Sequence, residues 1–229
     1  MTPEDGTPMT AARIVSVNVV HALIPDTLGS LDRTAIDKRG LEGRVYVGTL
    51  GLQGDDQYDK KHHGGIKQAV YAYAREDTDW WAAELGYPIT PGRFGENLST
   101  SGVDVTGAVL GERWRIGDDG LVVQVVSPRI PCTTFQGWMD EPQWVKRFTG
   151  HGAPGAYLRV VAEGTVGAGD EVEVAHRPDH GVTIGEVFVI RRADADRLRR
   201  ALDDPDVDDE LADEIRHDLE VRARNQSPR

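Results

Sequence analysis

Short apolar segments, each bounded by glycine or a polar turn, recur along most of the chain. β-branched and aromatic residues are common in them, as in residues 13–23, 43–51, 67–74, 121–127 and 155–164. Short segments of this composition, bounded by turn residues, are typical of strands. A chain of many short strands with few helices favours a β-rich barrel, so we expect a mainly β fold with some α.

Two segments within this region have the pattern of helices instead. Residues 75–86 (REDTDWWAAELG) place Trp81 and Leu85 one turn apart on an apolar face and are stopped by Gly86. Residues 141–150 (EPQWVKRFTG) indicate a second, short helix. Between two expected strands, the turn DDG at 118–120 predicts a hairpin.

The composition changes after residue 181. Thr183 and Glu186 have the spacing of a helix-capping box, and Leu211, Ile215 and Leu219 recur at helical spacing. We expect a β-barrel domain over residues 1–175, a linker at 175–181 and three short helices over 181–225. Each helix carries few apolar residues, so the tail must dock on the barrel or on another subunit, as in a homodimer. Nothing in it resembles a metal or pterin motif.

Composition excludes several classes of protein. The chain has 229 residues, a formal net charge of −12 and one cysteine. A net charge this negative is unfavourable for binding duplex nucleic acid. A single cysteine excludes an intrachain disulfide and a four-thiolate iron–sulfur cluster, so any redox chemistry needs electrons from outside. No apolar run reaches the length of a membrane span and no signal pattern opens the chain, so we expect a cytoplasmic protein without membrane contact.

The single cysteine, Cys132, follows a strand-like run and sits in the sequence SPRIPCTTF. Free cysteines are often buried and inert, which is the plain structural interpretation. A thiol before a short turn or helix and close to Arg129 would instead have a lowered pKa and react or bind metal as the thiolate. The sequence by itself leaves both interpretations open.

Two polar, glycine-rich loops could hold a ligand. In DKKHHGGIK the backbone N–H groups of Gly64 and Gly65 could face an anion, with Lys67 adding charge. The adjacent His62 and His63 lack the spacing of a catalytic zinc site and suit a surface or loop-structuring role. In GRFGENL the donors could bind a polar heterocycle, or the loop could be shaped so only by its turns.

Four motifs occur in order along the chain: KHHGGIKQAVYAY (61–73), GRFGENLSTSGVDV (92–105), IGD (116–118) and VVQVVSPRIPC (122–132). Together they resemble the molybdenum-cofactor sulfurase C-terminal (MOSC) domain over roughly residues 40–175. The cysteine after SPRIP and the FGENL loop resemble the stand-alone bacterial YiiM-like branch in particular. The helical tail is similar to the three-helix C-terminal domain of that branch.

The resemblance implies a MOSC-type β-barrel that binds the molybdenum cofactor (molybdopterin) and reduces small N-hydroxylated substrates with electrons from a separate reductase. Cys132 would be the thiolate ligand of molybdenum and a catalytic residue; a soft thiolate suits a metal already held by the sulfurs of the pterin. Candidates for the phosphate and ring of the pterin would be Lys67, Arg93, Arg129, Gly64 and Gly65. Asp59 and Glu96 as catalytic groups, and His63 and Asn97 beside the cofactor, would line the substrate side or orient the first ligands.

Two other functions remain open at this point. The chain could be a non-redox carrier of the molybdenum cofactor or of sulfur, in which Cys132 holds a persulfide and hands it on. It could also be a degenerate barrel that only binds a partner, in which case Cys132→Ser would be tolerated. The aminotransferase-like portion of the eukaryotic cofactor sulfurases is missing from the sequence, which disfavours cysteine desulfuration by this chain alone.

Overall fold

The computed structural model describes residues 11–56, 58, 64–190 and 193–226. Most strands form one sheet of eight, in the order β11-β7-β8-β9-β5-β6-β1-β2, and three more form a small sheet in the order β10-β3-β4. All neighbouring strands are antiparallel except β5 and β6. The strands are β1 (Arg13–Pro25), β2 (Arg33–Gly40), β3 (Arg44–Gly48), β4 (Gly51–Leu52), β5 (Val70–Ala74), β6 (Leu98–Ser101), β7 (Arg113–Ile116), β8 (Leu121–Pro128), β9 (Ala156–Ala162), β10 (Gly164–Gly167) and β11 (Val172–His176).

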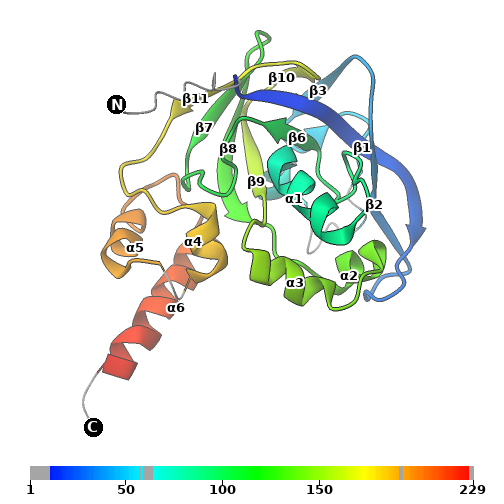
Figure 1. Cartoon of the computed structure of the whole chain (residues 1–229). Helices are drawn as coiled ribbons and strands as arrows, with labels where there is room; N and C mark the ends of the chain where they lie inside the picture. The colour runs from blue at the N-terminus through cyan, green and yellow to red at the C-terminus, as the bar shows by residue number, and fades with distance from the viewer. Residues whose placement is uncertain (1–10, 57, 59–63, 191–192, 227–229) are drawn as a thin grey trace, which may run out of the picture.

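Helices cover one end of the large sheet and form the C-terminal tail (Figure 1). They are η1 (Ile66–Gln68), α1 (Arg75–Leu85), α2 (Thr133–Met139), α3 (Trp144–His151), α4 (Ile184–Phe188), α5 (Ala195–Ala201) and α6 (Asp209–Gln226). The helices predicted from residues 75–86 and 141–150 are confirmed, and Gly86 ends α1 in the left-handed conformation. The hairpin between β7 and β8 is also confirmed.

The fold is a mixed α/β fold with a large sheet, and the predicted barrel is not confirmed. Within the described residues, no ladder joins the edge strands β11 and β2. The nearest approach to closure is at the start of β1, where Arg13 forms an isolated bridge with Glu171 and the N–H of Ile14 donates to the carbonyl of Asp170. The sheet therefore curves until its β11 edge meets β1, an inner strand, rather than β2.

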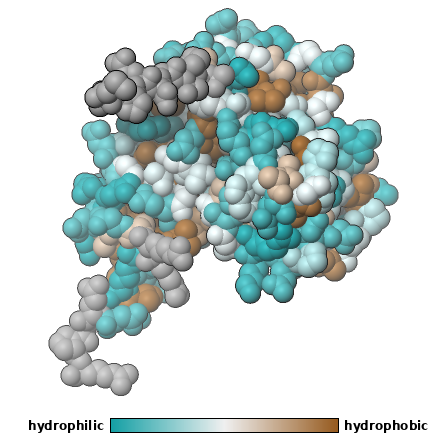
Figure 2. Space-filling view, in the orientation of Figure 1, coloured by the Kyte–Doolittle hydropathy of each residue, from teal (hydrophilic) through white to brown (hydrophobic). Residues whose placement is uncertain are grey.

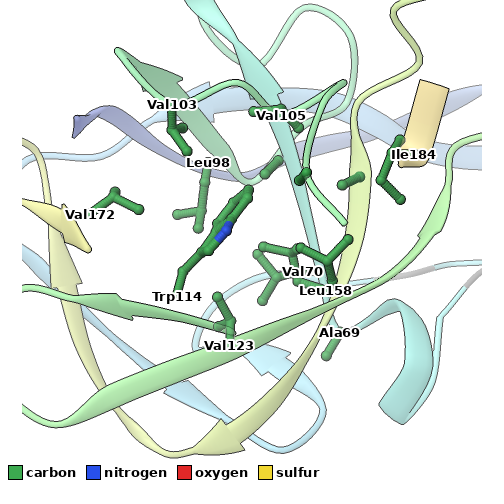
Figure 3. Packing of buried hydrophobic residues seen from close by; sticks show 14 of the residues in the cluster. Ala69, Val70, Leu98, Val103, Val105, Trp114, Val123, Leu158, Val172 and Ile184 are labelled. Atoms are coloured by element: carbon green, nitrogen blue, oxygen red, sulfur yellow. The ribbon is translucent and has the colours of Figure 1, made fainter. Parts of the chain in front are cut away.

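The main apolar core is enclosed by the curved sheet. Trp114 lies at its centre among Leu98, Val105 and Val123 (Figure 3). Its indole N–H donates to Oε1 of Glu112 over 2.7 Å, so the ring is fully buried without an unpaired donor. This core fixes the strands whose ends carry the polar residues described below.

A second, aromatic core lies beneath α1, α2 and α3. Its buried members are Tyr71, Tyr73, Trp81, Ile89, Phe94, Phe135, Met139, Trp144 and Phe148. Three tryptophans, Trp81, Trp114 and Trp144, are fully buried, whereas Trp80 is 46% exposed. Cys132 packs against the edge of this aromatic core.

The tail packs on the sheet through the same apolar cluster that fills the main core. That cluster includes Leu198 of α5 and Leu211 and Ile215 of α6. The predicted capping box is present, since Thr183 and Glu186 bond each other's backbone N–H groups at the start of α4. The helices are not all short as expected, because α6 has 18 residues and projects away from the sheet (Figure 1).

The predicted linker at 175–181 is held against the sheet. Arg177 Nε donates to Oε2 of Glu112 over 2.7 Å, and the buried His180 lies 3.1 Å from the carbonyl oxygen of Leu110. The division into two domains at this point stays a prediction. Every helix in the described ranges is too short or too polar to cross a lipid bilayer.

Candidate functional site

A cavity of about 410 Å³ opens where β8 ends and β9 begins. Its volume is in the range of pockets that hold cofactors and other small ligands. Because β8 and β9 are antiparallel, the end of β8 lies beside the start of β9, where Ser127 pairs with Tyr157. The wall is formed by Ser30, Leu31, Thr34, Ala35, Ile36, Lys38, Asp56, Tyr58, Gly64, Gln68, Tyr71, Phe94, Gly95, Asn97, Arg129, Cys132, Thr133, Thr134 and Tyr157.

Cys132 is a half-buried residue of this wall and immediately precedes α2. Its carbonyl oxygen accepts the N–H of Gln136, which fixes the backbone at the first turn of α2. The turn is tied to the loop after β1, since Thr134 Oγ1 donates to Oδ2 of Asp26 over 2.8 Å. These hydrogen bonds hold the backbone of Cys132 in place, while the residue itself lines the cavity.

Arg129 lies three residues before Cys132 and is only 6% exposed. Its guanidinium carbon lies 3.6 Å from the ring centroid of Phe135, close enough for a cation–π interaction. Nη1 is buried and has no hydrogen-bond partner among the described residues. Burial raises the pKa of the neighbouring Tyr157, and the positive charge of Arg129 partly offsets that rise. An unpaired, buried cationic donor in a cavity wall suits an anionic or acceptor-rich ligand.

A second cation in the wall, Lys38 of β2, was missed by the sequence analysis. It is 9% exposed and forms an ion pair with Oδ2 of Asp55. The same Oδ2 accepts from Asn97 Nδ2 over 2.8 Å, and Oδ1 accepts the N–H of Val20 over 2.8 Å. Burial lowers the pKa of Lys38, and Asp55 opposes that shift. The strand β2 (RTAIDKRG) contains so many charged residues that its partial burial is not evident from the sequence. Ala35 and Asp37 are both buried and stand two residues apart, the spacing of one strand face, which is a weak signal of that burial.

Glu96 and Asn97 hold backbone segments together at the cavity. Glu96 is buried behind the wall, and its carboxylate accepts from the N–H of Gly92, the N–H of Phe94 and Oγ of Ser99. Burial raises its pKa, and those hydrogen bonds lower it in part. Asn97 Oδ1 accepts the N–H of Tyr71 over 3.0 Å. The contacts of Glu96 are those of a residue that shapes the FGENL loop.

Two of the predicted cations lie outside the cavity wall. Arg93 stacks on Trp138, with its guanidinium carbon 4.2 Å from the ring centroid, and donates to the carbonyl oxygen of the same residue. Lys67 Nζ lies 2.8 Å from Oδ2 of Asp208, at the start of α6. The structure thus brings Arg129 and Lys38, rather than Arg93 and Lys67, to the cavity that Cys132 lines.

The glycine loop contributes to the wall through Gly64. Both Gly64 and Gly65 have a positive φ, at 119° and 78°, which a residue with a side chain rarely adopts. The N–H of Gly64 donates to Oε1 of Gln68 over 3.1 Å, while Gly65 is exposed and lies outside the wall. Asp59, His62 and His63 lie outside the described residues. In the part of the chain that is described, no three His, Cys, Asp or Glu side chains gather as a metal-binding group.

Comparison with known sequences decides the family. The sequence model of the MOSC domain family matches residues 59–173, half of the chain, and this range includes the glycine loop, the FGENL loop and Cys132. The chain belongs to the MOSC domain family. Within it the chain is YiiM-like, as the relatives show. It is 34% identical over 161 residues to protein YiiM of Escherichia coli strain K12, a match that covers 69% of this chain and 70% of that protein.

Further relatives of this MOSC protein come from other organisms. Protein YflK of Bacillus subtilis strain 168 is 32% identical over 177 residues, covering 76% of this chain and 79% of YflK. A protein of Gibberella moniliformis named "Reductase" is 31% identical over 156 residues, and this chain spans only 27% of its length. The crystal structure of YiiM from Geobacillus stearothermophilus superimposes with a TM-score of 0.71 over 91% of this chain and 99% of that one, at 24% identity, which shows a shared fold.

The residues of the cavity fit the kind of cofactor for which the domain is named. A phosphorylated pterin is anionic and rich in acceptors, and the buried Nη1 of Arg129 is a donor that no described residue pairs with. A single thiol at Cys132 cannot hold a metal by itself, but it can complete the ligand set of a metal that already has other soft ligands. Lys38 adds a second positive charge on the β2 side of the wall.

Proposed function

We propose that this protein is a molybdenum-dependent oxidoreductase that reduces small N-hydroxylated compounds. The observation that carries the proposal is the shared cavity of Cys132 and Arg129, a soft ligand beside a buried arginine whose Nη1 has no hydrogen-bond partner among the described residues. The fungal relative named "Reductase" supports a redox role over simple binding. Molybdopterin, when bound, would supply a centre that takes up and delivers two electrons.

In this proposal, the chain's own residues hold the cofactor and shape the space for the substrate. Cys132 would bind the metal through its sulfur. Arg129 would donate to the phosphate or ring of the pterin, and Lys38 would compensate a second negative charge. Gly64, where a side chain would be strained, lets the backbone of its loop come close to the ligand.

The reaction balances without the oxidation of any group of the chain. Reduction of R–NH–OH to R–NH₂ and water consumes two electrons and two protons. With one cysteine the chain has no dithiol to provide the electrons, so a separate reductase would supply them, and solvent would supply the protons. A reducing compartment such as the cytoplasm suits both the reduced thiol of Cys132 and such a donor.

Turnover with an artificial donor tests the proposal. Protein made in a host that synthesises molybdopterin should oxidise reduced viologen only when an N-hydroxylated amidine is added, and should release the amidine. Cys132→Ser should lower this rate by at least about 100-fold because a hydroxyl is a poor ligand for a soft metal. Wild-type rates in Cys132→Ser would exclude the proposal and favour a binding-only domain.

The same preparation addresses the sulfur-carrier alternative. A carrier would contain sulfur that cyanide releases from Cys132, and it would show no viologen oxidation even when it is fully loaded with molybdenum. We expect the opposite combination: turnover, and no cyanide-labile sulfur on the cysteine. Cyanide-labile sulfur together with an inactive, molybdenum-loaded protein would replace the oxidoreductase proposal by the carrier.

A further inference from the structure

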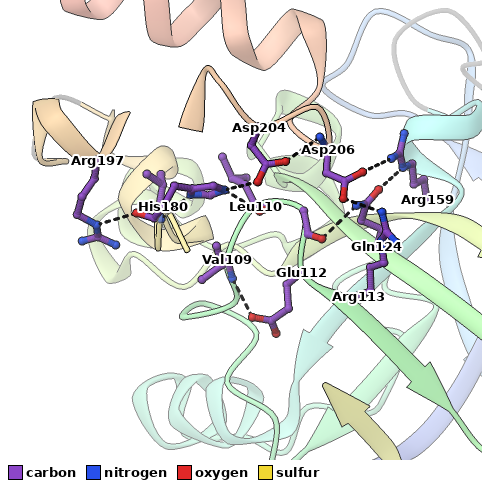
Figure 4. Close-up of polar contacts among 12 residues, drawn as sticks. Val109, Leu110, Glu112, Arg113, Gln124, Arg159, His180, Arg197, Asp204 and Asp206 are labelled. Carbon is purple, nitrogen blue, oxygen red and sulfur yellow. Dashed lines mark hydrogen bonds and ion pairs between the residues drawn. The ribbon is translucent and has the colours of Figure 1, made fainter. Parts of the chain in front are cut away.

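The segment DDPDVDD (203–209), which joins α5 to α6 and ends with the first residue of α6, carries five aspartates, and Asp206 among them contacts two cations of the sheet. Asp206 Oδ2 accepts from Arg113 Nη2 of β7 over 2.6 Å (Figure 4). Its Oδ1 lies 3.3 Å from Nη2 of Arg159 of β9. Asp206 is thus shared by two strands, and Arg159 is held on its other side by Gln124 of β8. We call residues 203–209 the acidic loop.

Asp208 of the acidic loop reaches the glycine loop through Lys67. Lys67 Nζ lies 2.8 Å from Oδ2 of Asp208 and 3.6 Å from Oε2 of Glu210. Lys67 belongs to η1, a single turn in which the N–H of Gln68 donates to the carbonyl oxygen of Gly65. A contact with Lys67 is therefore a contact with the turn that carries Gln68.

Two residues of the cofactor cavity also face the tail. Gln68 and Tyr157 line the cavity beside Cys132, and they also line a second cavity of about 270 Å³. The other side of that second cavity includes Val187 of α4 and Leu211 of α6. The ion pairs of the acidic loop are made to Lys67, next to Gln68, and to Arg159, two residues after Tyr157. The tail thus supports the back of the wall that these two residues form.

We infer that the acidic loop positions this wall of the cofactor cavity, with Asp208 as a positioning residue acting through Lys67. The inference rests on the proposed function in one respect, because the measurement of molybdenum content requires that the protein binds the cofactor. The sequence predicts only that the tail docks on the barrel or on another subunit, so the inference adds a role of the tail at the cavity. Lys67 is 46% exposed, so the effect of one pair should be modest, about two- to fivefold.

Charge exchange tests the inference in the full-length protein. Asp208→Lys and Lys67→Asp each replace the attraction by a repulsion, and the double variant restores an opposite pair. Asp196→Lys is the matched control, because Asp196 pairs with Arg199 within α5 and lines none of the cavities described above. Two quantities are measured for each variant: the molybdenum content per chain, and the rate at which iodoacetamide alkylates Cys132 in protein from a host that lacks the cofactor.

Each single exchange should lower the molybdenum content and speed the alkylation of Cys132 about two- to fivefold, and the double variant should return both towards wild type. Asp196→Lys should match wild type in both. Unchanged alkylation in Asp208→Lys, or a double variant no better than the singles, would overturn the inference. Melting temperatures show whether a single variant is unfolded. In that case the double variant decides whether the ion pair positions the cavity wall. If wild type holds no molybdenum, the proposed function fails, while the alkylation series still tests the role of the acidic loop.

Discussion

The guanidinium of Arg129 lies over the ring of Phe135, 3.6 Å from its centroid, and leaves Nη1 buried without a partner among the described residues. The ring belongs to the aromatic core under α2, the helix that begins directly after Cys132. Cation and thiol are thus fixed by the same short helix. Stacking fixes the orientation in which Arg129 can donate to a ligand. In the ligand-free protein, however, the buried Nη1 without a partner lowers stability.

This arrangement predicts opposite effects of Arg129→Met on stability and on cofactor binding. Without the cofactor, the variant should be at least as stable as wild type, because it removes a buried, unpaired donor and keeps the packing on Phe135. Its molybdopterin content should fall about 10- to 100-fold, the effect of one lost charge-assisted hydrogen bond. Chemical denaturation of cofactor-free protein and pterin fluorescence after release measure the two effects. Lower stability with full pterin content would contradict this role.

Glu96 should matter for folding rather than for chemistry. Glu96→Ala leaves two backbone N–H groups and the hydroxyl of Ser99 without their acceptor in a buried loop, so we expect a loss of roughly 2–4 kcal/mol in the free energy of unfolding. Glu96→Gln keeps an acceptor of the same shape and should lose less. Urea denaturation gives both values. A stable, molybdenum-loaded Glu96→Gln variant without turnover would instead support the catalytic role that the sequence predicts.

Asp77 of α1 should make stability depend on pH. Burial, together with Asp104 and Glu76, raises its pKa from 3.8 to about 6. Because the folded protein favours the protonated form, the stabilising contribution is complete below pH 3.8 and is lost as the pH rises through about 6. Asp77→Asn cannot ionise, so its free energy of unfolding should gain about 1–3 kcal/mol on wild type between pH 4 and pH 8. If the difference in free energy of unfolding between Asp77→Asn and wild type stays constant over this pH range, the raised pKa of Asp77 is refuted.

Local patterns were enough to predict much of the fold. The capping box of Thr183 and Glu186, the end of α1 at Gly86 and the hairpin between β7 and β8 depend on neighbours in sequence, and all three are present. β6 was not predicted, because Leu98–Ser101 lies inside a glycine-rich stretch that has the composition of a loop. It is a strand because it pairs with β5 and β1, which are distant in sequence.

The site could be predicted only in part, for the same reason. The family motif indicates Cys132, and both Cys132 and the nearby Arg129 line the cavity. Nearness to a motif does not determine where a long side chain points: Lys67 turns to Asp208, which is 141 residues away, and Arg93 stacks on Trp138. Lys38 was missed because its burial depends on Asp55, which lies on a different segment.

The molybdenum content of the purified protein and of its Cys132→Ala variant tests the central claim most directly. For protein from a host that makes molybdopterin, elemental analysis should give about one molybdenum atom per chain in wild type and less than about a tenth of that in the variant. Both proteins should have the same melting temperature without the cofactor, since the lost volume is small and lies at the edge of a cavity. Wild-type protein without molybdenum, or a variant that retains it fully, would contradict the assignment of Cys132 as the ligand of a molybdenum cofactor.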